Sequence, residues 1–225
     1  MKLIFLCRRR ADISHPRYVE LLLDGHVPLA LAHHPTLRRY VVNIVEESPP
    51  GWDDLDSIGE LSFDTLEDFQ QRLYDSAEGR RIIERDVAGF MGGAQAYATT
   101  EYVQRAAAVS AALGTRTAGV KLVCPIVRCP DLTHAAFVSH WLEHHVPLAL
   151  ELHPGMTKYV TNVVDARLSG AGPDLDGIAE LHFGAAQALQ AGIFASRQAE
   201  QRVRQDIDRF IGRTAAYRVA EYPQK

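Results

Sequence analysis

Cysteine is scarce in this sequence of 225 residues, and no hydrophobic run is long enough for a signal peptide or a membrane-spanning helix. The three cysteines, Cys7, Cys124 and Cys129, lack both the pairing of a secreted disulfide-bonded domain and the spacing of a metal site. We therefore expect the protein to lie in a reducing compartment, the cytoplasm, and to have no membrane partner.

An excess of positive charge is also missing, because the formal net charge is −4 at pH 7. A nucleic-acid-binding protein needs a sustained basic face to contact phosphates. The run Arg8–Arg10 is an exception that the second half of the chain does not repeat, and we interpret it as a solvated strand end. The sequence predicts no nucleic-acid partner.

The sequence contains no Gly-x-Ser-x-Gly elbow, no Walker loop and no Gly-x-Gly-x-x-Gly motif that opens a helix. Nucleophilic-serine, nucleotide and flavin chemistry therefore have no motif to support them. His140 and His144 have the i, i+4 spacing of two metal ligands on one helix face. No glutamate completes a metalloprotease pattern around them, and the first half has Leu21 and Gly25 at these positions. We predict neither a cofactor nor a metal.

The two halves of the chain share one sequence pattern, which identifies a tandem duplication. A shift of 119 positions places residues 26–31 on 145–150, and one inserted residue changes the shift to 120 after Asn43. We divide the chain into repeat 1 at residues 1–104, a linker at 105–118 and repeat 2 at 119–225. The matched pairs include Lys2 and Lys121, His26 and His145, Tyr40 and Tyr159, Asn43 and Asn162, Glu60 and Glu180, and Asp86 and Asp206.

Each repeat is predicted to contain a strand, a helix, two strands, a second helix and a last strand. Runs rich in β-branched and aromatic residues indicate the strands, and Ser14 and Thr133 are suitable N-caps for the first helices. The second helical stretch of repeat 1 is expected to be interrupted near residues 76–79. The predicted strands are 2–8, 38–46, 57–63 and 94–103, then 158–165, 177–183 and 214–221, and the second helical stretches are 65–89 and 185–211.

This βαββαβ order is that of the ferredoxin-like unit, an antiparallel sheet with both helices on one face. The other face of each sheet must also be covered. Two such repeats on one chain can pack through their sheets as an intramolecular α/β barrel that encloses a pocket. The predicted fold class is therefore α+β, with the alanine-rich linker forming either a short helix or a flexible tether.

The motifs of both repeats resemble the EthD family of the dimeric α/β barrel superfamily, over nearly the whole chain. The motifs are an arginine-rich end of the first strand, a Tyr or Phe on the helix, His-x-Pro-Leu, a tyrosine on the second strand and a Gly-Ile-x-Glu-Leu third strand. The residues are Arg8–Arg10, Tyr18, His26–Leu29, Tyr40 and Ile58–Leu61 in repeat 1, and Phe137, His145–Leu148, Tyr159 and Gly177–Leu181 in repeat 2. The resemblance implies the barrel fold, but it implies no single chemistry, because the superfamily includes isomerases, cyclases, dehydratases and cofactor-free monooxygenases.

His26 and His145 are the first catalytic candidates. Each lies two residues before a proline, which we expect to disrupt the helix and place the ring beside irregular backbone. An imidazole with an unperturbed pKa of about 6.5 exchanges protons near neutrality, although such a histidine can equally cap free carbonyls. The resemblance implies that Tyr40 and Tyr159 line the same pocket and contact a substrate oxygen.

The alternation of side chains along the third strand places Glu60 and Ser62 on one face, and Glu180 and His182 on the matching face of repeat 2. We expect Leu61, on the other face, to meet the helices. The carboxylates then point into a polar barrel interior, unless the strand end is simply exposed.

Asn43 and Asn162 are secondary candidates on the second strands. Tyr40 and Asn43 are separated by an odd number of positions, so an undistorted strand cannot direct both into one pocket. The asparagines could instead bond a loop or face the helices. We nevertheless place them, with Ser62 and His182, among the residues expected to bind substrate.

The sequence thus predicts a cofactor-free acid–base enzyme of the isomerase, dehydratase (lyase) or cyclase type. Its partner is a small, partly apolar, oxygenated metabolite in the barrel pocket. A histidine acts as acid or base, a tyrosine polarises a carbonyl, and Glu60 or Glu180 orients the pair. The alternatives are a non-catalytic binding or accessory protein and a cofactor-independent monooxygenase. The tandem chain is expected to be a monomeric barrel or a homodimer.

Overall fold

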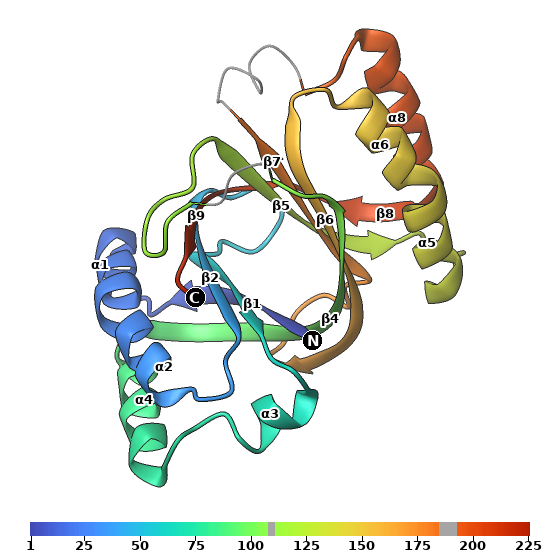
Figure 1. Cartoon of the computed structure of the whole chain (residues 1–225). Coiled ribbons are helices and arrows are strands. Elements are labelled where there is room, and N and C mark those ends of the chain that lie inside the picture. The colour runs from blue at the N-terminus through green and yellow to red at the C-terminus, as the bar shows by residue number, and fades with distance from the viewer. Residues whose placement is uncertain (108–110, 185–192) are drawn as a thin grey trace.

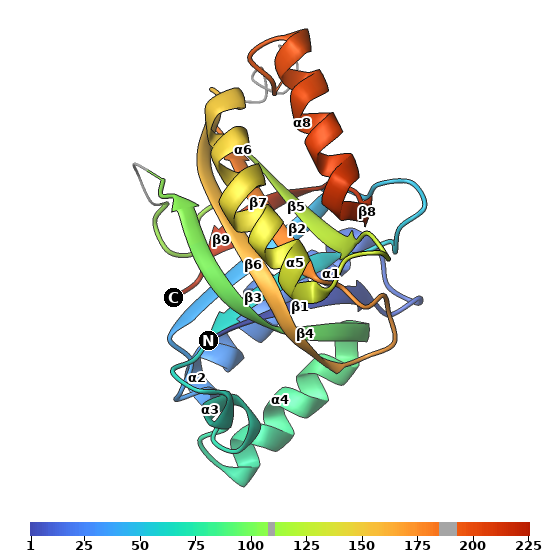
Figure 2. The same ribbon diagram turned by 90° about the vertical axis from the view of Figure 1, so that its right-hand side faces the viewer.

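The computed structural model describes residues 1–107, 111–184 and 193–225. No helix in these ranges is both long and apolar enough to cross a membrane. Figure 1 shows two groups of helices on opposite sides of a ring of strands, and Figure 2 shows the same layers from the side. The architecture is α+β, as the sequence predicts.

Repeat 1 has four strands with its helices on one side of them. Its first helical stretch runs from His15 to His33 without a break. Its second is interrupted as expected, and Ser76 caps the new helix by accepting a hydrogen bond from Gly79 N. The elements are β1 (Lys2–Arg9), α1 (His15–Glu20), η1 (Leu21–His26), α2 (Val27–His33), β2 (Arg39–Glu47), β3 (Ser57–Ser62), α3 (Leu66–Gln70), α4 (Ala77–Phe90) and β4 (Met91–Arg105).

Repeat 2 follows the same order. Of the predicted helix at 185–211, residues 197–210 form α8, residues 193–196 are not helical, and residues 185–192 lie outside the described ranges. Residues 108–110 of the linker also lie outside them, and the rest of the linker contains no helix. The elements are β5 (Val120–Arg128), α5 (His134–His140), η2 (Trp141–His145), α6 (Val146–Leu152), β6 (Met156–Ser169), β7 (Gly177–Phe183), α8 (Arg197–Phe210), β8 (Ile211–Thr214) and β9 (Tyr217–Pro223).

The strands of both repeats form one closed antiparallel barrel. Around it the order is β7, β6, β4, β1, β3, β2, β9 and β5, and β5 pairs with β7 to close the ring. Two seams join the repeats, β4 with β6 and β2 with β9. The duplication therefore supplies both halves of the barrel within one chain and pairs strand edges that a single repeat would leave open.

The prolines do not break the first helical stretches, which corrects that expectation, but the backbone at His26 and His145 is not regular α-helix. Residues Leu21–His26 form a π-helical turn, and Pro28 lies in the first turn of α2. A π turn is wider than an α turn, so it shifts the hydrogen-bonding register of the helix just before Pro28, which has no N–H to donate. Ser14 and Thr133 are the N-caps of α1 and α5, as predicted.

The two faces of each sheet bury different side chains. Facing the helices of repeat 1, Leu3, Tyr40 and Leu61 contribute to an apolar layer. Inside the barrel, Ile4 and Ile58 belong to a separate apolar cluster at one end, whereas the other end holds charged side chains. The alternation predicted for the third strand is thus confirmed, because Glu60 and Leu61 point to opposite sides of the sheet.

Candidate active site

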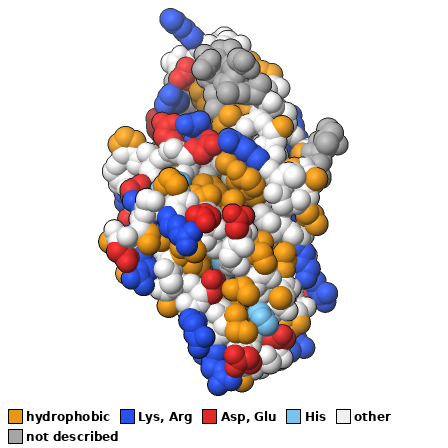
Figure 3. Space-filling model, turned by 90° about the vertical axis from the view of Figure 1, so that its left-hand side faces the viewer, with side chains coloured by type: hydrophobic (Ala, Val, Ile, Leu, Met, Phe, Trp, Pro, Cys, Tyr) orange, Lys and Arg blue, Asp and Glu red, His pale blue; other side chains and the backbone are white. Residues whose placement is uncertain are grey.

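A cavity of about 260 Å³ lies between the sheet and the helices of repeat 1. We call it the repeat-1 cavity. Most of its lining is apolar, including Leu22, Val42 and Phe69, and His26 and Tyr40 are among the few polar groups. Figure 3 views the side of the molecule on which α1, α2 and α4 lie, and shows hydrophobic side chains gathered between charged ones.

His26 is paired with a carboxylate from the second helix of its repeat. Its Nδ1 lies 2.8 Å from Asp86 Oδ2, and its ring packs against Phe90 with centroids 5.5 Å apart. His26 ends η1 and Asp86 lies on α4, so the packing of the two helices forms the pair. With Nδ1 bonded to the carboxylate, Nε2 is the ring nitrogen left for a molecule in the cavity.

Tyr40 lies on β2 opposite Leu61 of β3 and therefore faces the helices, where it lines the same cavity. Burial raises the pKa of its hydroxyl, so the group is neutral at physiological pH and can donate a hydrogen bond. No described residue receives a hydrogen bond from this hydroxyl. The repeat-1 cavity thus combines an oriented imidazole with a phenol donor.

Repeat 2 keeps the histidine and its partner, but a larger side chain lies beside its tyrosine. His145 Nδ1 lies 2.9 Å from Asp206 Oδ2, and burial lowers the pKa of this histidine. At the position matching Leu22, repeat 2 has Trp141, whose indole donates a 3.1 Å hydrogen bond to the Tyr159 hydroxyl. The indole packs where a Cβ on Gly177 would overlap it, and repeat 1 has Ser57 at that position.

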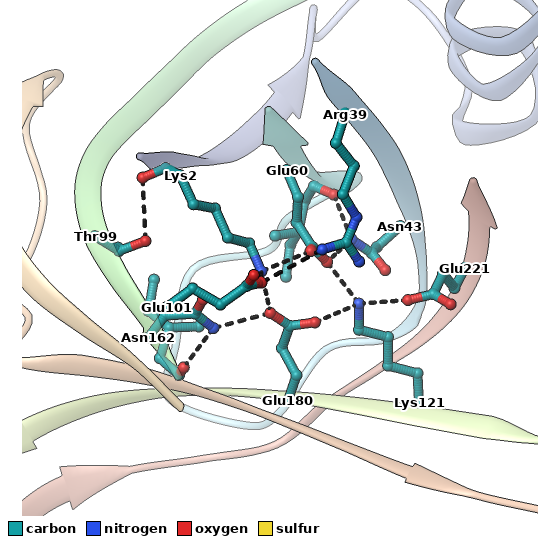
Figure 4. A network of polar contacts seen from close by, with 12 residues as sticks. Lys2, Arg39, Asn43, Glu60, Thr99, Glu101, Lys121, Asn162, Glu180 and Glu221 are labelled. Carbon is teal, nitrogen blue, oxygen red and sulfur yellow. Dashed lines mark hydrogen bonds and ion pairs between the residues drawn. The ribbon is translucent and has the colours of Figure 1, made fainter. Parts of the chain in front are cut away.

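Glu60 and Glu180 lie inside the barrel, where two lysines join them in a closed ring of ion pairs (Figure 4). Lys2 Nζ lies 2.8 Å from Glu60 Oε2 and 2.5 Å from Glu180 Oε1. Lys121 Nζ lies 2.5 Å from Glu60 Oε1 and 2.8 Å from Glu180 Oε2. All four side chains are at least 95 % buried. Each carboxylate therefore contacts one lysine from each repeat.

Protonation in this ring follows from its geometry. Burial alone would raise the pKa of Glu60, but the ion pairs with Lys121 and Lys2 outweigh it and hold the pKa well below its usual range. Burial would lower the pKa of Lys121, but the surrounding glutamates raise it. The glutamates are thus ionised at neutral pH and are poorly suited to take or give a proton.

Asn43 and Asn162 contact the ring of ion pairs and do not line the repeat-1 cavity. Asn43 Nδ2 donates to Glu60 Oε1 at 2.8 Å and to Ile58 O at 2.9 Å. Asn162 Nδ2 donates to Glu180 Oε1 in the same way, at 2.8 Å. Ser62 is the last residue of β3, and His182 is the last but one of β7. His182 lines a second cavity at this end of the barrel.

The structure therefore divides the predicted residues between two places. His26 and Tyr40 meet at the repeat-1 cavity, whereas Glu60 points to the other face of the sheet and cannot orient them. This corrects the expectation that one barrel pocket holds a histidine, a tyrosine and a glutamate. Asp86 occupies the orienting position instead, and the sequence signal for it is its match with Asp206. The register of β2 against β3 decides this division.

Comparison with known proteins supports the α/β barrel fold described above. The EthD domain model matches residues 10–94 and 129–214. An anthrone oxidase-like protein has a TM-score of 0.65 at 12% identity, over 99% of this chain and 92% of that one. A candidate monooxygenase from Fusobacterium nucleatum has a TM-score of 0.62 at 8% identity, over 100% and 92% of the two chains.

A further candidate monooxygenase, from Lactobacillus acidophilus, has a TM-score of 0.56 at 9% identity and covers 100% of this chain and 95% of that one. At such identities the likeness concerns the fold alone. No curated protein matches the sequence. The EthD match covers most of both repeats, and the chain therefore belongs to the EthD family.

Proposed function

We propose that the protein is an enzyme that transfers a proton on a small, largely apolar, oxygenated molecule held in the repeat-1 cavity. The observation that carries the proposal is the 2.8 Å pair of His26 and Asp86 beside an apolar cavity that Tyr40 also lines. A volume of about 260 Å³ suits a compact molecule, since ligand sites usually measure roughly 300–1,000 Å³.

In this proposal His26 Nε2 removes a proton from carbon next to a carbonyl group. Asp86 keeps the imidazole in the tautomer whose Nε2 is unprotonated and stabilises the imidazolium that forms. The Tyr40 hydroxyl donates a hydrogen bond to the carbonyl oxygen, on which negative charge develops. Return of the proton to another atom completes an isomerisation, and loss of a leaving group completes a dehydration.

Deuterium exchange tests this chemistry without knowledge of the natural substrate. The probes are anthrone, 2-indanone and acetylacetone, carbonyl compounds of different size with acidic C–H bonds, incubated in D₂O under argon and followed by mass spectrometry. We expect exchange above the buffer rate for at least one probe, and a loss of about 10²-fold or more in His26→Gln and Asp86→Asn.

The matched controls come from repeat 2. His145→Gln and Asp206→Asn change the matching pair of repeat 2, in which Asp206 also lies 3.0 Å from His140 Nε2, and they should leave exchange near the wild-type rate. Exchange that survives His26→Gln in a folded protein contradicts the proposal. Binding of a probe without any exchange supports the accessory-protein alternative.

Oxygenation is the second candidate, because two similar structures are named as candidate monooxygenases and a third as anthrone oxidase-like. The same proton removal would leave a carbanion that reacts with O₂, so anthrone and one O₂ would give anthraquinone and one water. An oxygen electrode separates the two functions. Oxygen consumption that depends on His26 favours oxygenation, and exchange without oxygen consumption favours acid–base catalysis.

A further inference from the structure

A second cavity, of about 340 Å³, lies at the charged end of the barrel. We call it the barrel-mouth cavity. Its lining comes from the first residues of β2 and β6 and the last residues of β4, β7 and β9, with linker residues on one side. It lies on the barrel face of the sheet, whereas the repeat-1 cavity lies on the helix face, so the two are separate sites.

The acidic groups at the barrel mouth already have partners. Glu101 Oε1 accepts a 2.9 Å hydrogen bond from Lys2 Nζ, and Glu221 Oε2 accepts one of 2.8 Å from Lys121 Nζ (Figure 4). Thr117 also donates to Glu221, at 2.9 Å. These carboxylates and the ring beneath them therefore satisfy the two buried lysines.

The basic groups lining the cavity are paired far more loosely. Arg39 and Lys158 occupy matching positions in the two repeats. The guanidinium of Arg39 comes no closer than 3.5 Å to Glu101, and Lys158 Nζ lies 3.9 Å from Glu221. Among the described residues neither side chain makes a hydrogen bond. Because Glu101 and Glu221 are held by Lys2 and Lys121, the loosely paired Arg39 and Lys158 are the cationic side chains in the cavity that can contact an anion.

His182 supplies an unused polar atom at the same place. It is 6% exposed and lines the cavity. Its buried Nε2 lies 3.6 Å from Glu221 Oε2, too far for a hydrogen bond, and has no hydrogen-bond partner within the described ranges. Burial, together with the nearby Lys121 and Lys158, lowers the pKa of His182 to about 4 despite Glu221 and Glu180. The imidazole of His182 is therefore neutral at neutral pH. A buried donor without a partner is unfavourable, which points to a bound molecule as its partner.

A metal ion is the competing occupant. Glu180, His182 and Glu221 offer ligand atoms within 4.8 Å of one another. However, Lys121 Nζ lies 2.8 Å from an oxygen of each glutamate and holds the position between them. A metal would have to displace a buried ammonium group that the same carboxylates stabilise. An anion at Arg39 and Lys158 leaves that group in place and competes only with their looser contacts to Glu101 and Glu221.

We propose that the barrel-mouth cavity binds the carboxylate of a small organic acid. Arg39 and Lys158 neutralise its charge from the two repeats, and His182 donates a hydrogen bond from Nε2. The apolar body of the acid lies against Val41, Val103 and Val160, which line the same cavity.

Calorimetric titration with benzoate and its neutral counterpart benzamide tests the proposal on the whole chain. Benzoate should bind about tenfold more tightly than benzamide, and Arg39→Gln with Lys158→Gln should weaken benzoate by about tenfold or more. Arg38→Gln is the matched control, because Arg38 is exposed and bonds Asp64 outside the cavity. His182→Ser, which introduces the repeat 1 residue, should also weaken benzoate.

Nuclear magnetic resonance of the imidazoles locates the ligand. Benzoate bound at the barrel mouth should raise the pKa of His182, because a nearby anion favours the imidazolium. Equal affinity for benzoate and benzamide, or unchanged affinity in the Arg39 and Lys158 double variant, overturns the proposal. So does Mn²⁺ or Zn²⁺ binding that is lost in Glu221→Gln, since it would assign the cavity to a metal.

Discussion

Trp141 donates a hydrogen bond to Tyr159 across 3.1 Å, and its indole thereby fills the space that stays open beside Tyr40 in repeat 1. Leu22 occupies the matching position in repeat 1 and has a smaller side chain. Two repeats of common origin thus differ in the side chain beside the strand tyrosine, which is Leu22 in repeat 1 and Trp141 in repeat 2. This difference is the basis for placing catalysis in repeat 1.

Exchanging these residues should move the cavity from one repeat to the other. Trp141→Leu removes a buried indole and the donor to Tyr159, so we expect a loss of stability on the order of 3 kcal/mol and a new apolar cavity. Conversely, Leu22→Trp with Ser57→Gly should fill the repeat-1 cavity and abolish probe exchange. Urea unfolding and the deuterium assay measure the two effects. Full exchange in the filled variant would show that catalysis lies elsewhere.

Gly177 is predicted to depend on Trp141. A side chain at position 177 overlaps the indole, so Gly177→Ser should cost about 1–3 kcal/mol by overpacking. In the Trp141→Leu background the same change should be nearly neutral, which a double-mutant cycle measures. Gly59→Ala is the control, because its Cβ would meet its nearest neighbours at an ordinary 3.6 Å. Equal losses in both backgrounds would disprove the coupling.

His182 should make stability depend on pH. Its pKa is about 4 in the folded protein and near 6.5 when unfolded. Between these values the unfolded chain takes up a proton that the folded protein does not. The free energy of unfolding therefore falls as pH drops from about 6.5 to 4, by on the order of 3 kcal/mol.

Denaturation of wild type and His182→Ser across this range isolates the contribution of His182. The flanking groups Lys121, Lys158, Glu180 and Glu221 are common to both proteins. His144→Ser, at an exposed site, should keep the wild-type pH dependence. The prediction fails if His182→Ser and wild type lose stability in parallel.

Lys2 should be much more important for stability than a surface lysine or arginine. Lys2→Met leaves Glu60 and Glu180 each with one cationic partner fewer in a buried site, and such a change costs about 3–5 kcal/mol. Glu84→Gln breaks an exposed pair with Arg80 and should change stability by less than about 1 kcal/mol. Urea midpoints compare the two variants, and similar small losses would mean that the buried ring is dispensable.

The sequence by itself determined the duplication, the βαββαβ order and the barrel. It also determined the face of the strand on which Glu60 lies, because the alternation of side chains follows from the order of residues within that strand alone. The parity of Tyr40 and Asn43 likewise showed that the two side chains could not share a pocket. These inferences are local or compare the chain with itself.

The tertiary structure alone decided which of these side chains meet. Asp86 lies 60 residues from His26, and Lys121 lies 61 residues from Glu60. Such contacts depend on the register of β2 against β3, on helix packing and on the two seams between the repeats. Strand alternation predicts that two residues face the same side, but only the closed barrel brings four buried charges within ion-pair distance. Only packing places Leu22 beside an open cavity and Trp141 against Tyr159.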